Sequence, residues 1–154
     1  MGKTIYFDMD GTIYNLYGCA HWREKLEAEN VEVYREGAPL HNLAALARKL
    51  NSMRRNGFSI GVISWTSKNG SEKFNRKVEE VKREWLARHL PSVQFNEIHI
   101  VDYGVSKKEV ARDKNGWLVD DDERVLKDWG TLSFAPNRLI EQLKIIEELE
   151  NGVK

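Results

Sequence analysis

The segment KTIYFDMDGT, residues 3–12, decides how this chain folds. Its first five residues form a short, apolar and β-rich stretch that is typical of a buried strand. Two aspartates, Asp8 and Asp10, follow directly, and in an extended chain residues two apart project to the same side. Gly11 then allows the backbone to turn at once and to approach a ligand closely. The segment therefore predicts a buried strand that ends in a pair of carboxylates.

The rest of the chain alternates apolar strands with amphipathic helices. We predict strands at residues 58–64, 97–101, 116–119 and 131–134, and helices at residues 39–56, 71–90, 106–112 and 136–150. Strands that alternate with helices of this length favour right-handed crossovers and a mostly parallel sheet. We therefore expect an α/β fold, a Rossmann-like three-layer architecture with about five strands and helices on both faces of the sheet.

Polar side chains follow four of the predicted strands. In open parallel sheets, ligands bind beyond the carboxyl ends of the strands. The residues found there are Asp8 and Asp10, Ser64 to Ser67, Asp102 and Tyr103, and Asp120 to Asp122. Carboxylates that converge on one crevice raise one another's pKa unless a cation lies among them. Oxygen ligands select a hard ion, so we expect Mg²⁺, which in turn favours a substrate that bears a phosphate.

The composition favours one globular, cytoplasmic domain that spans residues 1–154. The chain has 24 Lys or Arg and 24 Asp or Glu, so its formal net charge is zero and no overall positive field attracts nucleic acid. A hydrophobic fraction of 41% argues against disorder, and no apolar run approaches the roughly 18 residues that a membrane span needs. A single cysteine, Cys19, suits a reducing compartment, and we expect no secretory signal. These properties argue against an extracellular scaffold, a membrane protein and a histone-like binder.

Four segments together resemble the motifs of the haloacid dehalogenase (HAD) superfamily. FDMDGT, residues 7–12, is similar to motif I, whose pattern is DxDx[TV], and WLVDDD, residues 117–122, is similar to the acidic pair of motif IV. Ser64 at the end of an apolar strand resembles motif II, and Lys107 within YGVSKKEVA resembles motif III. The motifs occur in the family's order. The segment KREWLARHLP, residues 82–91, also resembles a helix of the small deoxyribonucleotidase-like and phage-encoded members.

The resemblance implies a Mg²⁺-dependent phosphatase that works through a covalent aspartyl-phosphate. Asp8 would be the nucleophile, and Asp10 would protonate the leaving oxygen and then accept a proton from the attacking water. An acid at the position of Asp10 separates phosphatases from dehalogenases, which displace a halide and need no proton there. Ser64 would donate a hydrogen bond to a phosphoryl oxygen. Lys107 would neutralise charge on Asp8 and on the phosphoryl group, with the neighbouring Lys108 as the alternative for this role.

The resemblance also implies which residues hold the metal and the substrate. A carboxylate oxygen of Asp8, the backbone carbonyl of Asp10 and an acid of motif IV would bind Mg²⁺. Asp120 and Asp121 are both candidates for that acid; we favour Asp121 as the ligand and Asp120 as the partner that orients Lys107. Four further residues are expected to contact the substrate: Gly11, Thr12, Trp65 and Thr66.

The stretch after motif I, residues 13–38, is too short for an independent cap domain. We expect one helix within it, at residues 21–29, and a flap or minimal cap that leaves the crevice fairly open. Its tyrosines, or Trp65, are candidate surfaces on which a base could stack. An open crevice suits either a bulky phosphorylated partner or a small substrate enclosed by a second subunit. The resemblance to the deoxyribonucleotidase-like members implies a nucleotide or another small phosphorylated metabolite as the substrate.

Other functions stay open at this point. A polynucleotide-end phosphatase would need a basic groove beside the site, whereas an enclosed aromatic pocket would favour mononucleotides. A catalytically idle HAD-like module would bind a nucleotide or a protein, but it would have no physical need for the mutual repulsion of Asp8 and Asp10. An interaction protein would use the open face to form a tight oligomer. The sequence is compatible with both a monomer and a homodimer.

Overall fold

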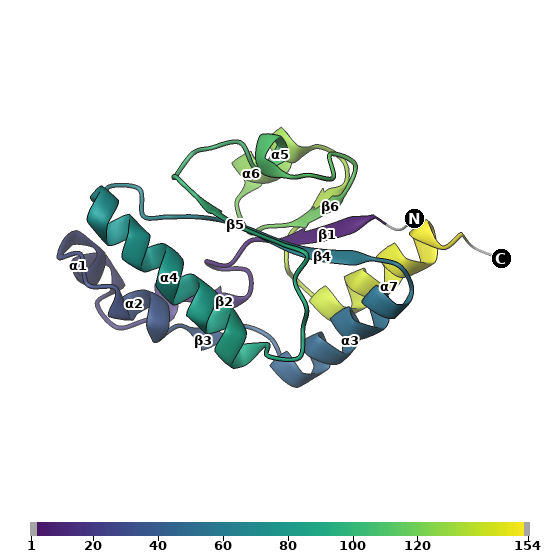
Figure 1. Cartoon of the computed structure of the whole chain (residues 1–154), viewed down its shortest axis with the longest axis horizontal. Helices are drawn as coiled ribbons and strands as arrows, with labels where there is room; N and C mark the ends of the chain where they lie inside the picture. Colours follow the sequence, from purple (N-terminus) through teal and green to yellow (C-terminus); the bar gives the residue numbers. More distant parts are fainter. Residues whose placement is uncertain (1–2, 153–154) are drawn as a thin grey trace.

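A five-stranded parallel sheet forms the centre of the computed structural model, which describes residues 3–152 (Figure 1). The strand order is β5-β4-β1-β6-β7, and each neighbouring pair runs parallel. The strands are β1 (Thr4–Phe7), β4 (Ser59–Trp65), β5 (Glu97–Val101), β6 (Trp117–Val119) and β7 (Ser133–Phe134). The predicted α/β class and Rossmann-like sheet are therefore confirmed. Among the described residues, no helix is long and apolar enough to cross a membrane.

Helices cover both faces of this sheet (Figure 1). One face carries α3 (Leu43–Arg55), α4 (Glu72–His89) and α7 (Leu139–Glu150), and the other carries α5 (Lys107–Val110) and α6 (Glu123–Trp129). Successive residues of β1 alternate between the two sides, as a strand requires. Ile5 and Phe7 join the large apolar cluster with α3, α4 and α7, whereas Tyr6 packs edge-on against Trp129 of α6. The sheet is thus the middle of three layers.

The flap, residues 13–38, is more divided than the sequence predicts. It contains β2 (Tyr14–Asn15), a 3₁₀ turn, α1 (Trp22–Glu27) and α2 (Glu32–Arg35), and β2 pairs antiparallel with β3 (Ala38–Pro39). The helix expected at residues 21–29 is shorter, because His21 and Glu29 on either side adopt left-handed backbone conformations with φ of 56° and 54°. A non-glycine residue in that conformation interrupts a right-handed helix.

Two contacts fix the flap to α4. The Glu29 carboxylate accepts hydrogen bonds from the backbone N–H and the hydroxyl of Ser71, at 2.7 and 2.8 Å. The indole N–H of Trp85 donates to the carbonyl of Gly37 at 3.2 Å. The second half of the flap is therefore held against α4 and its N-cap residue.

Local contacts explain where other elements differ from the sequence-based expectation. The helix predicted from residue 39 begins only at Leu43, because the Asn42 side chain caps it by accepting from the Ala45 N–H at 3.0 Å, while Pro39 belongs to β3. Helix α6 was not predicted as an element. Asp122 caps it by accepting from the Arg124 N–H at 2.9 Å.

A buried hydrogen-bond network ties the segment after α5 to the sheet. The Tyr6 hydroxyl donates to Glu97 at 2.7 Å and accepts from the Asp113 N–H at 3.0 Å. Glu97 also accepts from the Arg112 N–H at 3.2 Å. Burial raises the pKa of Glu97, but the hydrogen bonds from Tyr6, His99 and Arg112 outweigh it and hold that pKa below its ordinary value. The network holds the end of α5 against β1 and β5.

Tyr6→Phe is expected to lower the free energy of unfolding by about 1–3 kcal/mol, because a buried carboxylate loses a donor and the Asp113 N–H loses its acceptor. Urea unfolding followed by far-UV circular dichroism measures this change. Tyr17→Phe is the matched control, since the Tyr17 side chain is 52% exposed. Equal unfolding midpoints for the two variants would contradict the role given to the network.

Candidate active site

The carboxyl ends of β1, β4 and β6 bring the predicted site residues to one edge of the sheet. Asp8 follows β1, Trp65 ends β4, and Asp120 and Asp121 follow β6. The strands run parallel, so these ends point the same way. Helix α5 adds Lys107 from one face of the sheet.

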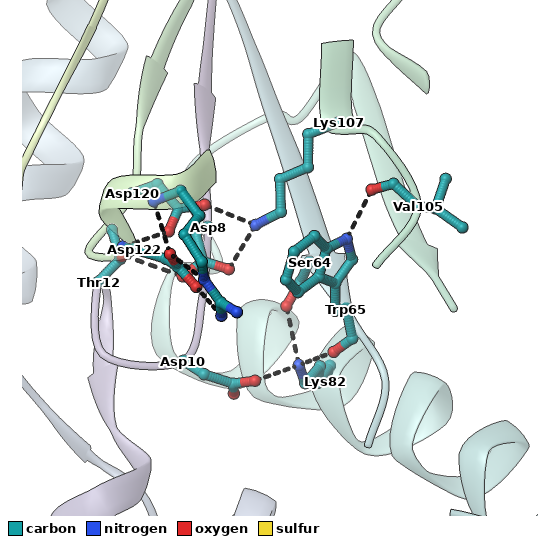
Figure 2. A network of polar contacts seen from close by, with 11 residues as sticks. Asp8, Asp10, Thr12, Ser64, Trp65, Lys82, Val105, Lys107, Asp120 and Asp122 are labelled. Atoms are coloured by element: carbon teal, nitrogen blue, oxygen red, sulfur yellow. Dashed lines mark hydrogen bonds and ion pairs between the residues drawn. The ribbon is translucent and has the colours of Figure 1, made fainter. Parts of the chain in front are cut away.

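Lys107 lies between two carboxylates (Figure 2). Its ammonium donates to Asp8 Oδ1 at 2.9 Å and to Asp120 Oδ2 at 2.7 Å, and the side chain is 2% exposed. Burial alone would lower the pKa of Lys107, but the charges of Asp8 and Asp120 raise it above its ordinary value, so the group stays an ammonium. Lys108 instead lies 4.7 Å from the centre of the Trp129 ring. Of the two neighbouring lysines, Lys107 is the one that reaches the aspartates.

Three carboxylates form a cluster that could hold a metal ion. One oxygen each from Asp8, Asp120 and Asp121 lies within 4.8 Å of the others. Burial and the charge of Asp8 raise the pKa of Asp121 to about 8 and that of Asp120 to about 6. With Asp120 already paired to Lys107, Asp121 is the better placed of the two to bind a cation.

The donor set of this cluster fits a hard divalent cation. Three carboxylates face one ammonium, which leaves two negative charges unbalanced when all three are ionised. Ligands that are all oxygen suit Mg²⁺, which retains several waters and needs few carboxylates. The cluster therefore fits the predicted ion in both charge and ligand chemistry.

Gly11 and Thr12 shape the loop around Asp8. Gly11 has a φ of 76°, and a Cβ at this position would collide with the Asp121 carboxylate. The Thr12 hydroxyl donates to Asp8 Oδ2 at 3.1 Å, and the residue is fully buried. Neither residue is among those that line the cavity described below. In this structure both residues lie against the aspartates, and their contact with the substrate stays a prediction.

The Asp10 side chain lies apart from the cluster of Asp8, Asp120 and Asp121 and has partners of its own (Figure 2). One of its oxygens accepts from the Tyr14 hydroxyl, and the other accepts from the Lys82 ammonium at 2.9 Å. The Asp10 side chain is 18% exposed and lines the cavity. Asp8 and Asp10 thus both reach the cavity, as their spacing predicts, but each is paired with a different lysine.

Lys82, which pairs with Asp10, is the buried charged residue of this site that the sequence reasoning missed. It lies in α4 and is 1% exposed. Its position, four residues after Val78 and three before Trp85, belongs to the apolar stripe of that helix. A lysine within an apolar stripe was the available signal, because buried lysines are rare unless paired.

The end of β4 brings three of the predicted residues, Ser64, Trp65 and Thr66, to the site. The Ser64 hydroxyl is fully buried and accepts from Lys82 at 2.8 Å, and Ser64 is not among the residues that line the cavity. Trp65 and Thr66 do line it. The Thr66 hydroxyl oxygen is buried and has no hydrogen-bond partner among the described residues. Thr66 therefore lines the cavity and carries a buried hydroxyl that has no partner among the described residues.

A cavity of about 650 Å³ opens in front of these groups. Asp8, Asp10, Lys107 and the acids after β6 form its floor, and Trp65, Thr66 and Tyr103 line it from the ends of β4 and β5. The centres of the Trp65 and Tyr103 rings lie 4.8 Å apart. Residues of the flap line the cavity as well: Leu16, Tyr17, Trp22, Arg23, Leu26, Glu27, Glu29 and Tyr34. The flap therefore builds a wall of the site.

Comparison with known proteins supports the fold. No family model matches this sequence, and no curated protein matches it. A D,D-heptose 1,7-bisphosphate phosphatase from Burkholderia thailandensis matches with a TM-score of 0.52 and 17% identity, over 84% of this chain and 73% of that one. The corresponding phosphatase from B. bronchiseptica, complexed with magnesium and phosphate, matches with a TM-score of 0.53 and 11% identity, over 91% of this chain and 86% of that one. At these identities the likeness establishes the fold, which is the one that the motif resemblance implied.

Mg²⁺ binding is expected to tighten as the pH rises towards 8 and to release protons at pH 7. The pKa of Asp121 is raised to about 8. Near pH 7 this carboxyl therefore holds a proton that the ion must displace, whereas above about pH 8 it is ionised and no proton is displaced. Calorimetry in two buffers of different ionisation enthalpy counts the released protons.

Asp121→Asn and Asp122→Asn form the matched pair for this measurement. We expect weaker binding and fewer released protons for Asp121→Asn, and little change for Asp122→Asn, whose carboxylate pairs with Arg124 at 2.8 Å. Equal effects of the two substitutions would contradict the assignment of the ligand.

Proposed function

We propose that this chain is a HAD-type phosphatase, a Mg²⁺-dependent phosphomonoesterase that works through an aspartyl-phosphate on Asp8. The observation that carries the proposal is the Asp8 carboxylate, which faces a cavity while Lys107 and Thr12 each hold one of its oxygens. A second carboxylate, Asp10, lines the same cavity as a proton carrier. Mg²⁺, held by Asp8, Asp121 and the Asp10 carbonyl, would supply positive charge to the phosphoryl group.

In the first step an oxygen of Asp8 attacks phosphorus, and the bond from phosphorus to the leaving oxygen breaks. The leaving oxygen takes a proton from Asp10 and departs as an alcohol, which leaves Asp8 phosphorylated and Asp10 ionised. Lys107 contributes by orienting Asp8 and by balancing the negative charge that builds up on the phosphoryl oxygens. The free hydroxyl of Thr66 is the proposed donor to one of those oxygens.

In the second step water attacks the phosphorus of the aspartyl-phosphate. Asp10 accepts the proton of this water as the bond between phosphorus and the Asp8 oxygen breaks. Phosphate is released, the Asp8 carboxylate is restored, and Asp10 is again protonated for the next turnover. Ser64 acts in this scheme only through Lys82, which binds both Ser64 and Asp10.

We propose a nucleotide or another small phosphorylated metabolite as the substrate. Four aromatic rings line the cavity and favour a substrate with a planar group: those of Tyr17, Trp22, Trp65 and Tyr103. Lys68 and Arg124 also line it and favour a substrate with further negative charge. The wall that the flap builds argues for a small substrate rather than a polynucleotide end. Nucleoside 5′-monophosphates should exceed ribose 5-phosphate in kcat/KM by roughly five- to 100-fold if the base stacks. Equal values would remove the nucleotide from this proposal.

Hydrolysis of p-nitrophenyl phosphate by the wild type and by Asp8→Asn, each with Mg²⁺ and with EDTA, tests the reaction. We expect turnover only in the wild type with Mg²⁺, and a loss of at least about 10³-fold in Asp8→Asn, because the amide keeps the shape but cannot act as the nucleophile. Activity that persists in Asp8→Asn would overturn the mechanism. A wild type that binds Mg²⁺ and a nucleotide without turnover would favour a HAD-like binding module.

Lys107→Met and Lys108→Met are a matched pair of neighbouring substitutions. We expect Lys107→Met to lower kcat by about 10²–10³-fold, because it removes an oriented cation beside Asp8. Lys108→Met should stay near the wild-type rate, since the Lys108 ammonium lies over Trp129. Steady-state kinetics, with circular dichroism to check folding, measures both, and a larger loss in Lys108→Met would reverse the motif III assignment.

A further inference from the structure

We propose that Lys82 is a positioning residue that orients the Asp10 carboxylate for proton transfer. This inference rests on the proposed function, in which Asp10 carries the proton. Lys82 contacts Asp10 Oδ2 at 2.9 Å, the Ser64 hydroxyl at 2.8 Å and the Trp65 carbonyl at 2.6 Å (Figure 2). An ammonium has three N–H groups, so each has one acceptor here.

The burial of Lys82 has no evident benefit for the fold. Its neighbours on the same helix face, Val78, Trp85 and Leu86, are buried and apolar. An apolar side chain at position 82 would pack among them without taking a charge out of water, and buried ion pairs are often no more stabilising than apolar residues of similar size. The charge of Lys82 instead acts on Asp10, which is its one carboxylate partner within the described residues.

Asp10 lies between the cavity and the two groups that hold it. Asp10 lines the cavity, whereas Lys82 and Tyr14 are not among the lining residues. Tyr14 binds one oxygen of Asp10 and Lys82 binds the other. A carboxylate oxygen has two acceptor positions, so both oxygens keep one for the substrate or the attacking water. Two donors behind the carboxylate restrict its rotation and leave its free positions available to the cavity.

Lys82 also links this carboxylate to the rest of the site. Through Ser64 and the Trp65 carbonyl, the same ammonium is bound to the end of β4, while Asp10 belongs to the loop after β1. These segments supply the proton carrier and the residues beside the phosphoryl group. A small displacement of a catalytic group has a large effect on rate. A contact that sets the distance between the loop after β1 and the end of β4 therefore affects the chemistry directly.

Leaving-group dependence tests this role. Phenyl, p-nitrophenyl and 2,4-dinitrophenyl phosphate have nearly the same shape, but their leaving oxygens need a proton to decreasing degrees. The value of kcat/KM reports only the steps up to release of the phenol, so hydrolysis of the aspartyl-phosphate does not enter. Lys82→Met removes the ammonium, and Lys77→Met is the control, because Lys77 is on the exposed side of the same helix.

We expect Lys82→Met to lower kcat/KM for phenyl phosphate by roughly 10²-fold, the usual contribution of a general acid, with a much smaller loss for 2,4-dinitrophenyl phosphate. Asp10→Asn should give the same dependence, and Lys77→Met should follow the wild type. A loss that is equal for all three esters would overturn the proposal, because general damage to the site does not distinguish leaving groups. Wild-type activity towards phenyl phosphate in Lys82→Met would overturn it as well.

A double variant covers the case in which Lys82→Met does not fold. Asp10→Asn with Lys82→Met removes both charges and leaves neither unpaired. If Lys82 acts through Asp10, the double variant should match Asp10→Asn in kcat/KM for each ester. A further loss in the double variant would mean that Lys82 acts on another group, contrary to the proposal.

An NMR measurement separates this inference from the function itself. In protein labelled with ¹⁵N-lysine, the Lys82 ammonium should give a slowly exchanging resonance that moves in Asp10→Asn and is unchanged in Asp8→Asn. A resonance that does not move in Asp10→Asn would contradict the contact between Lys82 and Asp10. A wild type without Asp8-dependent turnover would count against the proposed function and would leave this readout intact.

Discussion

A buried ammonium between two carboxylates, Lys107 between Asp8 and Asp120, is the interaction on which the site depends. Lys107 lies 99 positions from Asp8 in the chain, and its short helix is held in place by the network around Tyr6 and Glu97. Without this ammonium three carboxylates would face one another with no cation among them. Burial and the charges of the neighbouring carboxylates already raise the pKa of Asp121, and this repulsion would favour a divalent cation at this edge of the sheet.

The two aspartates of the loop after β1 form ion pairs with lysines from opposite faces of the sheet. Lys107 of α5 pairs with Asp8, and Lys82 of α4 pairs with Asp10 (Figures 1 and 2). The separation keeps two carboxylates that are two residues apart from competing for one cation. It also gives each carboxylate its own environment, as the proposed roles of nucleophile and proton carrier require.

The flap and Asp10 both contact the same helix, α4, or its cap. Its aromatic residues line the cavity, and its contacts through Glu29 to Ser71 and through Gly37 to Trp85 both end on α4 or its cap. Tyr14, the first residue of β2, in turn binds Asp10. One helix thus supports the wall of the cavity and the ion pair beside its floor. A short insertion can build a wall here because the main fold holds its second half at Glu29 and Gly37 and its start through Tyr14.

The sequence by itself determined the layered fold, the parallel strands and the carboxylates at their ends, because strand and helix periods and the order of motifs are local signals. The exact ends of several helices depend on capping contacts and backbone turns that are harder to predict from sequence, as at Asn42 and His21. The motif resemblance favoured Lys107 over Lys108 and Asp121 over Asp120, but only the tertiary structure showed which lysine contacts Asp8 and Asp120, and only it revealed Lys82 beside Asp10. Neighbouring residues of one type are equivalent in sequence. They become different when the fold buries one of them against a charge that is distant along the chain.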